Sequence, residues 1–122
     1  MSFEVIGLDH VQLAMPAGGE DVAESFYRGL LGFARVPKPE PMATRGGCWF
    51  VAGTAAVHLG VEADFRPARK AHPGLVVSQL DSLCELLDRS GHTTRRTEDV
   101  PGESQWYVDD PFGNRIELID AT

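Results

Sequence analysis

The sequence predicts an α+β fold built from two βαβββ modules, which form a cup-shaped mixed sheet with the helices on its outer face. Three observations support this prediction. The 122 residues suffice for one domain. A histidine stands in an apolar, strand-like run twice, at residues 9–13 and 71–75. A helical pattern and then three short strand-like runs follow each of them.

The helical pattern of the first half predicts a helix over residues 19–31. Val22, Phe26 and Leu30 recur at four-residue spacing on its expected buried face, and Gly32 is suited to follow its last turn.

The helical pattern of the second half predicts a helix over residues 79–90. Ser78 is the expected N-terminal cap, with Asp81 three residues later, and Gly91 should end the helix. The expected buried stripe consists of Leu80, Leu83 and Leu87.

The remaining apolar runs complete each module. Candidate strands cover 33–36, 48–52 and 56–62 in the first half, and 93–97, 105–108 and 114–120 in the second. The spacing from His10 to His72 is close to that from His58 to Glu117, as a duplication requires. We therefore expect module one over about 4–62, a polar surface linker over 63–71 and module two over about 72–120.

Composition narrows the functional classes. The net charge of −7 disfavours binding to a phosphate backbone, so no nucleic-acid partner is expected. No run approaches the ~20 apolar residues that span a bilayer, and no signal peptide is visible, so we expect a cytoplasmic protein without membrane contact. Cys48 and Cys84 show no metal or disulfide spacing and are expected to be reduced core residues.

Four polar residues are expected to face away from the helices. Because strand side chains alternate between faces, His58 must point opposite to Val57 and Leu59, and the same parity applies to His10, His72 and Glu117. A single strand histidine is usually a hydrogen-bonded core or rim residue. Four such residues at equivalent places of a repeat instead predict one site for a divalent metal, with zinc, nickel, cobalt, manganese and iron as candidates.

Other residues are candidates for the lining of the cup. Gln12 shares the face of His10 and Arg115 that of Glu117, so both are predicted to bind substrate, as is Arg69 in the basic linker. His92 follows Gly91 and is expected to be a turn residue. Strand parity does not decide which residue of each of two aromatic pairs lines the cup. The pairs are Trp49 and Phe50, and Trp106 and Tyr107.

At this point the sequence resembles the vicinal oxygen chelate superfamily, which includes glyoxalase I, fosfomycin-resistance thiol transferases, methylmalonyl-CoA epimerases, extradiol dioxygenases and bleomycin-resistance proteins. The motifs are L-D-H-V at 8–11, S-F-Y-R-G-L-L-G-F at 25–33 and D-P-F-G-N-R-I-E-L at 110–118. The resemblance implies that His10, His72 and Glu117 occupy the three common ligand positions. His58 occupies a fourth, where glyoxalase I typically carries a carboxylate.

The resemblance implies a metal-dependent lyase, isomerase or dioxygenase that chelates two neighbouring oxygens of a small molecule and stabilises an enolate or oxyanion. His58 and Glu117 are then the expected catalytic residues, with His58 either a fourth ligand or a base. The alternative is a bleomycin-resistance-like protein that sequesters a cationic drug, which the net charge of −7 would favour. Members of the superfamily commonly form homodimers, and we expect one here.

Overall fold

The structure is a computed structural model that describes residues 2–98, 101–102 and 105–121. Each half of the chain follows the order strand, helix, three strands, which confirms the two βαβββ modules. The first half contains β1 (Val11–Met15), α1 (Glu20–Tyr27), β2 (Ala34–Val36), a short 3-10 helix (Met42–Thr44), β3 (Cys48–Ala52) and β4 (Ala55–Val61). The second contains β5 (Gly74–Val77), α2 (Leu80–Arg89), β6 (Arg95–Thr97), β7 (Gln105–Asp109) and β8 (Arg115–Asp120).

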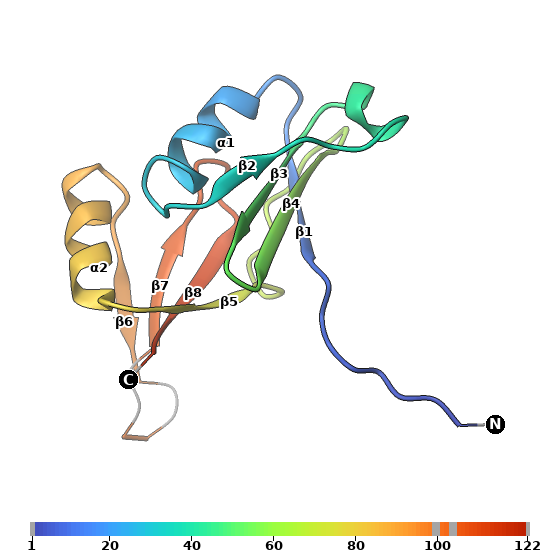
Figure 1. The fold of residues 1–122 in the computed structure, drawn as a ribbon. Coiled ribbons are helices and arrows are strands. Elements are labelled where there is room, and N and C mark those ends of the chain that lie inside the picture. The colour runs from blue at the N-terminus through green and yellow to red at the C-terminus, as the bar shows by residue number, and fades with distance from the viewer. Residues whose placement is uncertain (1, 99–100, 103–104, 122) are drawn as a thin grey trace.

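The strands form two four-stranded mixed sheets with the same topology. Their orders are β1-β4-β3-β2 and β5-β8-β7-β6, with β1 parallel to β4, β5 parallel to β8 and the other pairs antiparallel. The first strand of each module is therefore an edge strand. The N-terminal segment before β1 extends away from the rest of the chain (Figure 1).

The buried face of α1 agrees with the predicted one at Phe26 and Leu30 but not at Val22. Ala23, Phe26 and Tyr27 are buried, whereas Val22 is 51% exposed. The two aromatic rings bury more apolar surface than a valine can, so they decide which side of the helix faces the core. The helix ends at Tyr27 rather than 31, and Gly32 follows with a positive φ of 78°.

The start of α2 also differs from the predicted one. Ser78 does not cap α2, because Gln79 is the N-cap residue and no side chain caps the first turn. Gln79 has a left-handed backbone (φ 56°) that turns the chain sharply from β5 into the helix. Leu80 and Leu87 are buried as predicted, but Cys84 is buried with them and Leu83 is only partly covered.

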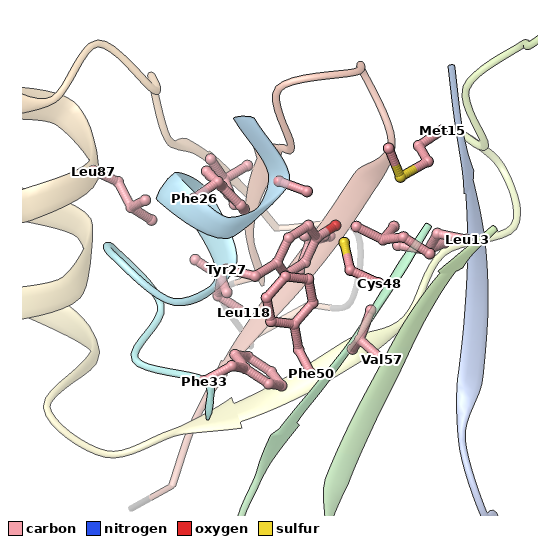
Figure 2. Packing of buried hydrophobic residues seen from close by; sticks show 14 of the residues in the cluster. Leu13, Met15, Phe26, Tyr27, Phe33, Cys48, Phe50, Val57, Leu87 and Leu118 are labelled. Atoms are coloured by element: carbon pink, nitrogen blue, oxygen red, sulfur yellow. The ribbon is translucent and has the colours of Figure 1, made fainter. Parts of the chain in front are cut away.

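Both modules contribute to one hydrophobic core. The ring of Tyr27 on α1 stacks on Phe50 of β3, with centroids 5.3 Å apart, and Leu118 of β8 belongs to the same cluster (Figure 2). Cys48 and Cys84 are buried free thiols, as predicted. No helix in the described parts of the chain is both long and apolar enough to cross a bilayer.

A buried polar turn between β7 and β8 joins the modules. Asp110 accepts hydrogen bonds from the Tyr27 hydroxyl (2.7 Å) and the Asn114 amide nitrogen Nδ2 (2.9 Å). Asn114 also donates to the Ala14 carbonyl of β1 and accepts from the Ala68 backbone N–H, both at 2.9 Å. Burial, and then the Asp110 carboxylate, raise the pKa of Tyr27 well above its usual value, so its hydroxyl remains a donor.

The Asn114→Ala substitution should lower the free energy of unfolding by about 2–4 kcal/mol, because it leaves buried partners in both modules without a hydrogen bond. Tyr27→Phe removes one hydrogen bond to Asp110 and should cost less, about 1.5 kcal/mol. Urea denaturation of both variants measures the difference. Two variants within about 0.5 kcal/mol of wild type would show that this turn does not hold the modules together.

Candidate metal centre

Three aromatic rings, from β3, β4 and the residue before β1, form a stack on the first sheet. His58 lies opposite Gln12 of β1 and Trp49 of β3 in the strand register. Its ring stacks on Trp49 at 3.8 Å and on His10, the residue before β1, at 4.1 Å. This resolves one aromatic pair: Trp49 lies on the face of His58, whereas Phe50 is fully buried in the core.

The ring stack keeps His58 neutral. The side chain is enclosed by its two ring neighbours, and only 8% of the residue is exposed. Burial, with a smaller contribution from the charge of His10, lowers the pKa of His58. Within the described residues, neither ring nitrogen forms a hydrogen bond, so an uncharged imidazole remains free to accept a proton or a metal ion.

His10 is oriented by its neighbour in the sequence. Its Nδ1 lies 2.8 Å from Oδ2 of Asp9. An ionised carboxylate can only accept a hydrogen bond, so Nδ1 carries the proton and Nε2 has a free lone pair. Such a contact to the second ring nitrogen is usual for histidines that bind metal.

The second sheet carries the matching pair, His72 and Glu117. Nδ1 of His72 donates to the Lys70 carbonyl at 2.8 Å, which leaves Nε2 of the neutral ring without a proton. That nitrogen faces Oε1 of Glu117 at 3.2 Å. Two lone pairs at this distance repel each other unless a cation lies between or beside them, either a proton on the ring or a metal ion.

The four predicted ligands therefore form two half-sites: His10 and His58 on the first sheet, and His72 and Glu117 on the second. Across residues 2–98, 101–102 and 105–121, no three His, Cys, Asp or Glu side chains gather closely enough to hold a metal ion. His10 and His72 both line a cleft of about 500 Å³ between the starts of β1 and β5. His58 and Glu117 are not among the residues that line this cleft.

The predicted substrate-binding residues lie in different places. Arg115 is on the same face as Glu117, and its guanidinium carbon is 5.5 Å from the centroid of Tyr107, the aromatic residue opposite Glu117. Gln12 shares the face of His58 but lies over Gly60, where an added Cβ would come within 2.5 Å of its Nε2. Arg69 is exposed in the linker, and within the described residues it forms no hydrogen bond or ion pair with either half-site.

Comparison with known proteins identifies the family. The sequence profile of the Glyoxalase/Bleomycin resistance protein/Dioxygenase superfamily matches residues 7–118. The chain belongs to this superfamily, also called the vicinal oxygen chelate superfamily. A glyoxalase family protein from Bacillus anthracis has 41% sequence identity and a TM-score of 0.92, with 100% of both chains covered. A search of curated proteins finds no match.

Other solved structures have the same fold at lower sequence identity. The fosfomycin resistance protein FosX from Listeria monocytogenes has 14% identity and a TM-score of 0.74, covering 98% of this chain and 96% of its own. TnmS3, an antibiotic binding protein from Streptomyces sp. CB03234, has 21% identity and a TM-score of 0.66, covering 97% and 100%. This fold thus occurs in a resistance protein and in an antibiotic binding protein, and it does not choose between these functions.

Two features of the half-sites were not predicted from the sequence. The acceptors that orient the histidines are Asp9 and the Lys70 carbonyl. Asp9 stands directly before His10, and that adjacency was an available signal. A backbone carbonyl leaves no trace in the residue types. His72 also contacts the edge of Tyr107 at 5.6 Å, so Tyr107 rather than Trp106 lies on the ligand face.

In metal-free protein, the free energy of unfolding should fall as the pH drops below about 6.5. The pKa of His58 is lowered in the folded state, so between that value and the ordinary one the unfolded chain binds more protons, and stability rises with pH. His58→Gln should flatten this part of the urea-denaturation profile. If the pH dependence of stability is unaltered in His58→Gln, the lowered pKa of His58 is not its cause.

Proposed function

We propose that the chain is a metal-dependent enzyme of the vicinal oxygen chelate type, a lyase, isomerase or dioxygenase that acts on a small oxygen-rich molecule. The observation that carries this proposal is the approach of His72 Nε2 and Glu117 Oε1 to 3.2 Å, with the proton of the ring committed to the Lys70 carbonyl. A nitrogen and an oxygen lone pair presented together are ligands for a divalent ion. The donor set therefore suits the metal that the superfamily commonly uses.

The residues of the chain have separate roles in this proposal. His10, His72 and Glu117 would hold the metal, and His58 is either a fourth ligand or the base. A bound divalent ion would supply Lewis-acid stabilisation of negative charge on two neighbouring substrate oxygens. Asp9 and the Lys70 carbonyl keep the two histidines in the ligand-ready tautomer.

His58 is suited to proton transfer. It is neutral, because burial lowers its pKa, and stacking on Trp49 and His10 fixes the plane of its ring. An imidazole held this way can accept a proton from a substrate carbon or oxygen at a ring nitrogen near neutral pH. Three ligands suffice for a catalytic metal site, so the fourth position is free for this role.

We also propose that a second copy of the chain completes the site. Support comes from the two half-sites, which lie on different sheets, each with only two ligands. Pairing the first sheet of one copy with the second sheet of another would unite His10 and His58 with His72 and Glu117. A twofold dimer would contain two such sites.

The surfaces near the half-sites support this arrangement. The N-terminal segment before β1 extends away from the sheets (Figure 1). Its apolar residues Phe3, Val5 and Ile6 are 84%, 91% and 93% exposed. Val76 on the edge strand β5 is 71% exposed, on the face that carries Glu117. Exposed apolar side chains beside two open sheet edges are typical of a surface covered by another chain.

The alternative is a binding protein that sequesters a cationic drug without metal chemistry. The net charge of −7 favours it electrostatically, and TnmS3 shows that the fold occurs in an antibiotic binding protein. Such a protein has no need of histidines held in the ligand-ready tautomer. Metal content separates the two proposals.

Protein purified without an affinity tag should bind about one divalent ion per chain, with affinity falling as pH drops because ligation requires neutral imidazole. His72→Ala, His10→Ala and Glu117→Ala should each remove most of it, because each deletes one of three ligands. Inductively coupled plasma mass spectrometry measures the content. His92→Ala is the matched control and should keep the full content.

Full metal content in all three ligand variants would make the site assignment wrong. His58→Ala distinguishes the two roles of that residue. Retention of most of the metal is expected if His58 is a base, whereas loss equal to that of His72→Ala would make it a structural fourth ligand.

A further inference from the structure

We propose that Arg115 recognises an acidic group of the substrate, so that the site takes a small anion whose carboxylate or phosphonate lies a few bonds from the two chelating oxygens. This inference rests on the proposed metal site and specifies its substrate class. The chain around Arg115 is acidic overall, with a net charge of −7. A cation without an acidic partner, on the face of β8 that carries Glu117, is therefore unusual in this chain.

Arg115 begins β8, two residues before Glu117, and both side chains project from the same face of the strand. Its guanidinium lies over the ring of Tyr107, with the central carbon 5.5 Å from the ring centroid. Tyr107 in turn contacts His72 at 5.6 Å. The aromatic ring thus holds the guanidinium beside the second half-site.

Two acidic residues lie close to Arg115 in the sheet, and neither forms an ion pair with it. Asp109 is directly opposite it in the strand register, but its carboxylate contacts Arg95 at 3.1 Å. Glu117 faces His72 at 3.2 Å. In the described parts of the chain, Arg115 has no ion pair, and its Nε is buried without a hydrogen-bond partner.

A guanidinium without an acidic partner in the protein is available to pair with an anionic ligand. The guanidinium presents parallel N–H donors that match two oxygens of a carboxylate or phosphonate. Two residues along a strand span about 6.6 Å, so one small molecule can reach both the metal ligands and Arg115. The same positive charge disfavours a cationic ligand on this face.

Two chelators that differ only by an acidic group test this proposal. Acetohydroxamate and phosphonoacetohydroxamate both present two neighbouring oxygens to a metal, and only the second carries a phosphonate. Isothermal titration calorimetry with the Co²⁺-loaded protein gives both affinities. We expect phosphonoacetohydroxamate to bind at least about 10-fold more tightly to wild type.

Arg115→Gln should reduce that preference to less than about 3-fold while the affinity for acetohydroxamate stays unchanged. Arg89→Gln, the same charge change at the exposed end of α2, should retain the full preference. Arg115→Lys keeps the positive charge but not the paired N–H donors of the guanidinium, so it should retain part of the preference. Thermal unfolding establishes that each variant is folded.

A wild-type protein without preference for the phosphonate, or an Arg115→Gln protein that retains it, would overturn the proposal. Failure of the metal site has a different signature, because the wild type then takes up no Co²⁺. In that case phosphonoacetate is titrated into the metal-free protein. Binding that Arg115→Gln abolishes would support the acidic subsite without the metal, and absence of binding would reject it.

Discussion

The buried hydrogen-bonded turn at Asp110 and Asn114 is the constraint on which the rest of the structure depends. Its side chains bind Tyr27 of α1, the carbonyl of Ala14 on β1 and the backbone of the linker at Ala68. All are buried or partly buried, so each unpaired group would incur a desolvation penalty. The turn therefore fixes one arrangement of the two modules. It also sets where β8 begins, and hence the positions of Arg115 and Glu117.

That arrangement has a consequence for the chemistry. With the modules joined through α1 and a common core, each sheet presents only its own pair of ligands, and within the described residues no larger group forms. In the proposed site, each pair would offer the metal histidine nitrogens that carry no proton. Asp9 and the Lys70 carbonyl fix the histidine tautomers, and stacking holds His58 neutral. A site divided in this way makes assembly of the protein a condition for its activity, if a second copy supplies the missing half.

Much of the fold could be predicted from the sequence because the repeat is regular. Strand parity correctly separated His58 and Glu117 from the core, and Gly91 marked the end of α2, whereas α1 ends at Tyr27, well before Gly32. The first residue of β3 was uncertain, so strand parity could not tell whether Trp49 or Phe50 lies on the face of His58. The register of β3 with β4 shows that it is Trp49. Val22 was wrongly placed in the core because four-residue spacing alone cannot tell which side of a helix faces a sheet. The division of the ligands into pairs depends on how the modules pack, and no local pattern reports that packing.

We propose that each metal site combines the first module of one copy with the second module of another. Mixing His10→Ala and His72→Ala proteins after unfolding and refolding them together tests it most directly. In a mixed dimer one site loses both residues and the other retains all its ligands. Random pairing makes about half of the dimers mixed, so the mixture should recover about one quarter of the wild-type metal content, although neither variant binds metal alone. A site closed within one chain would recover none, and that result would contradict the account.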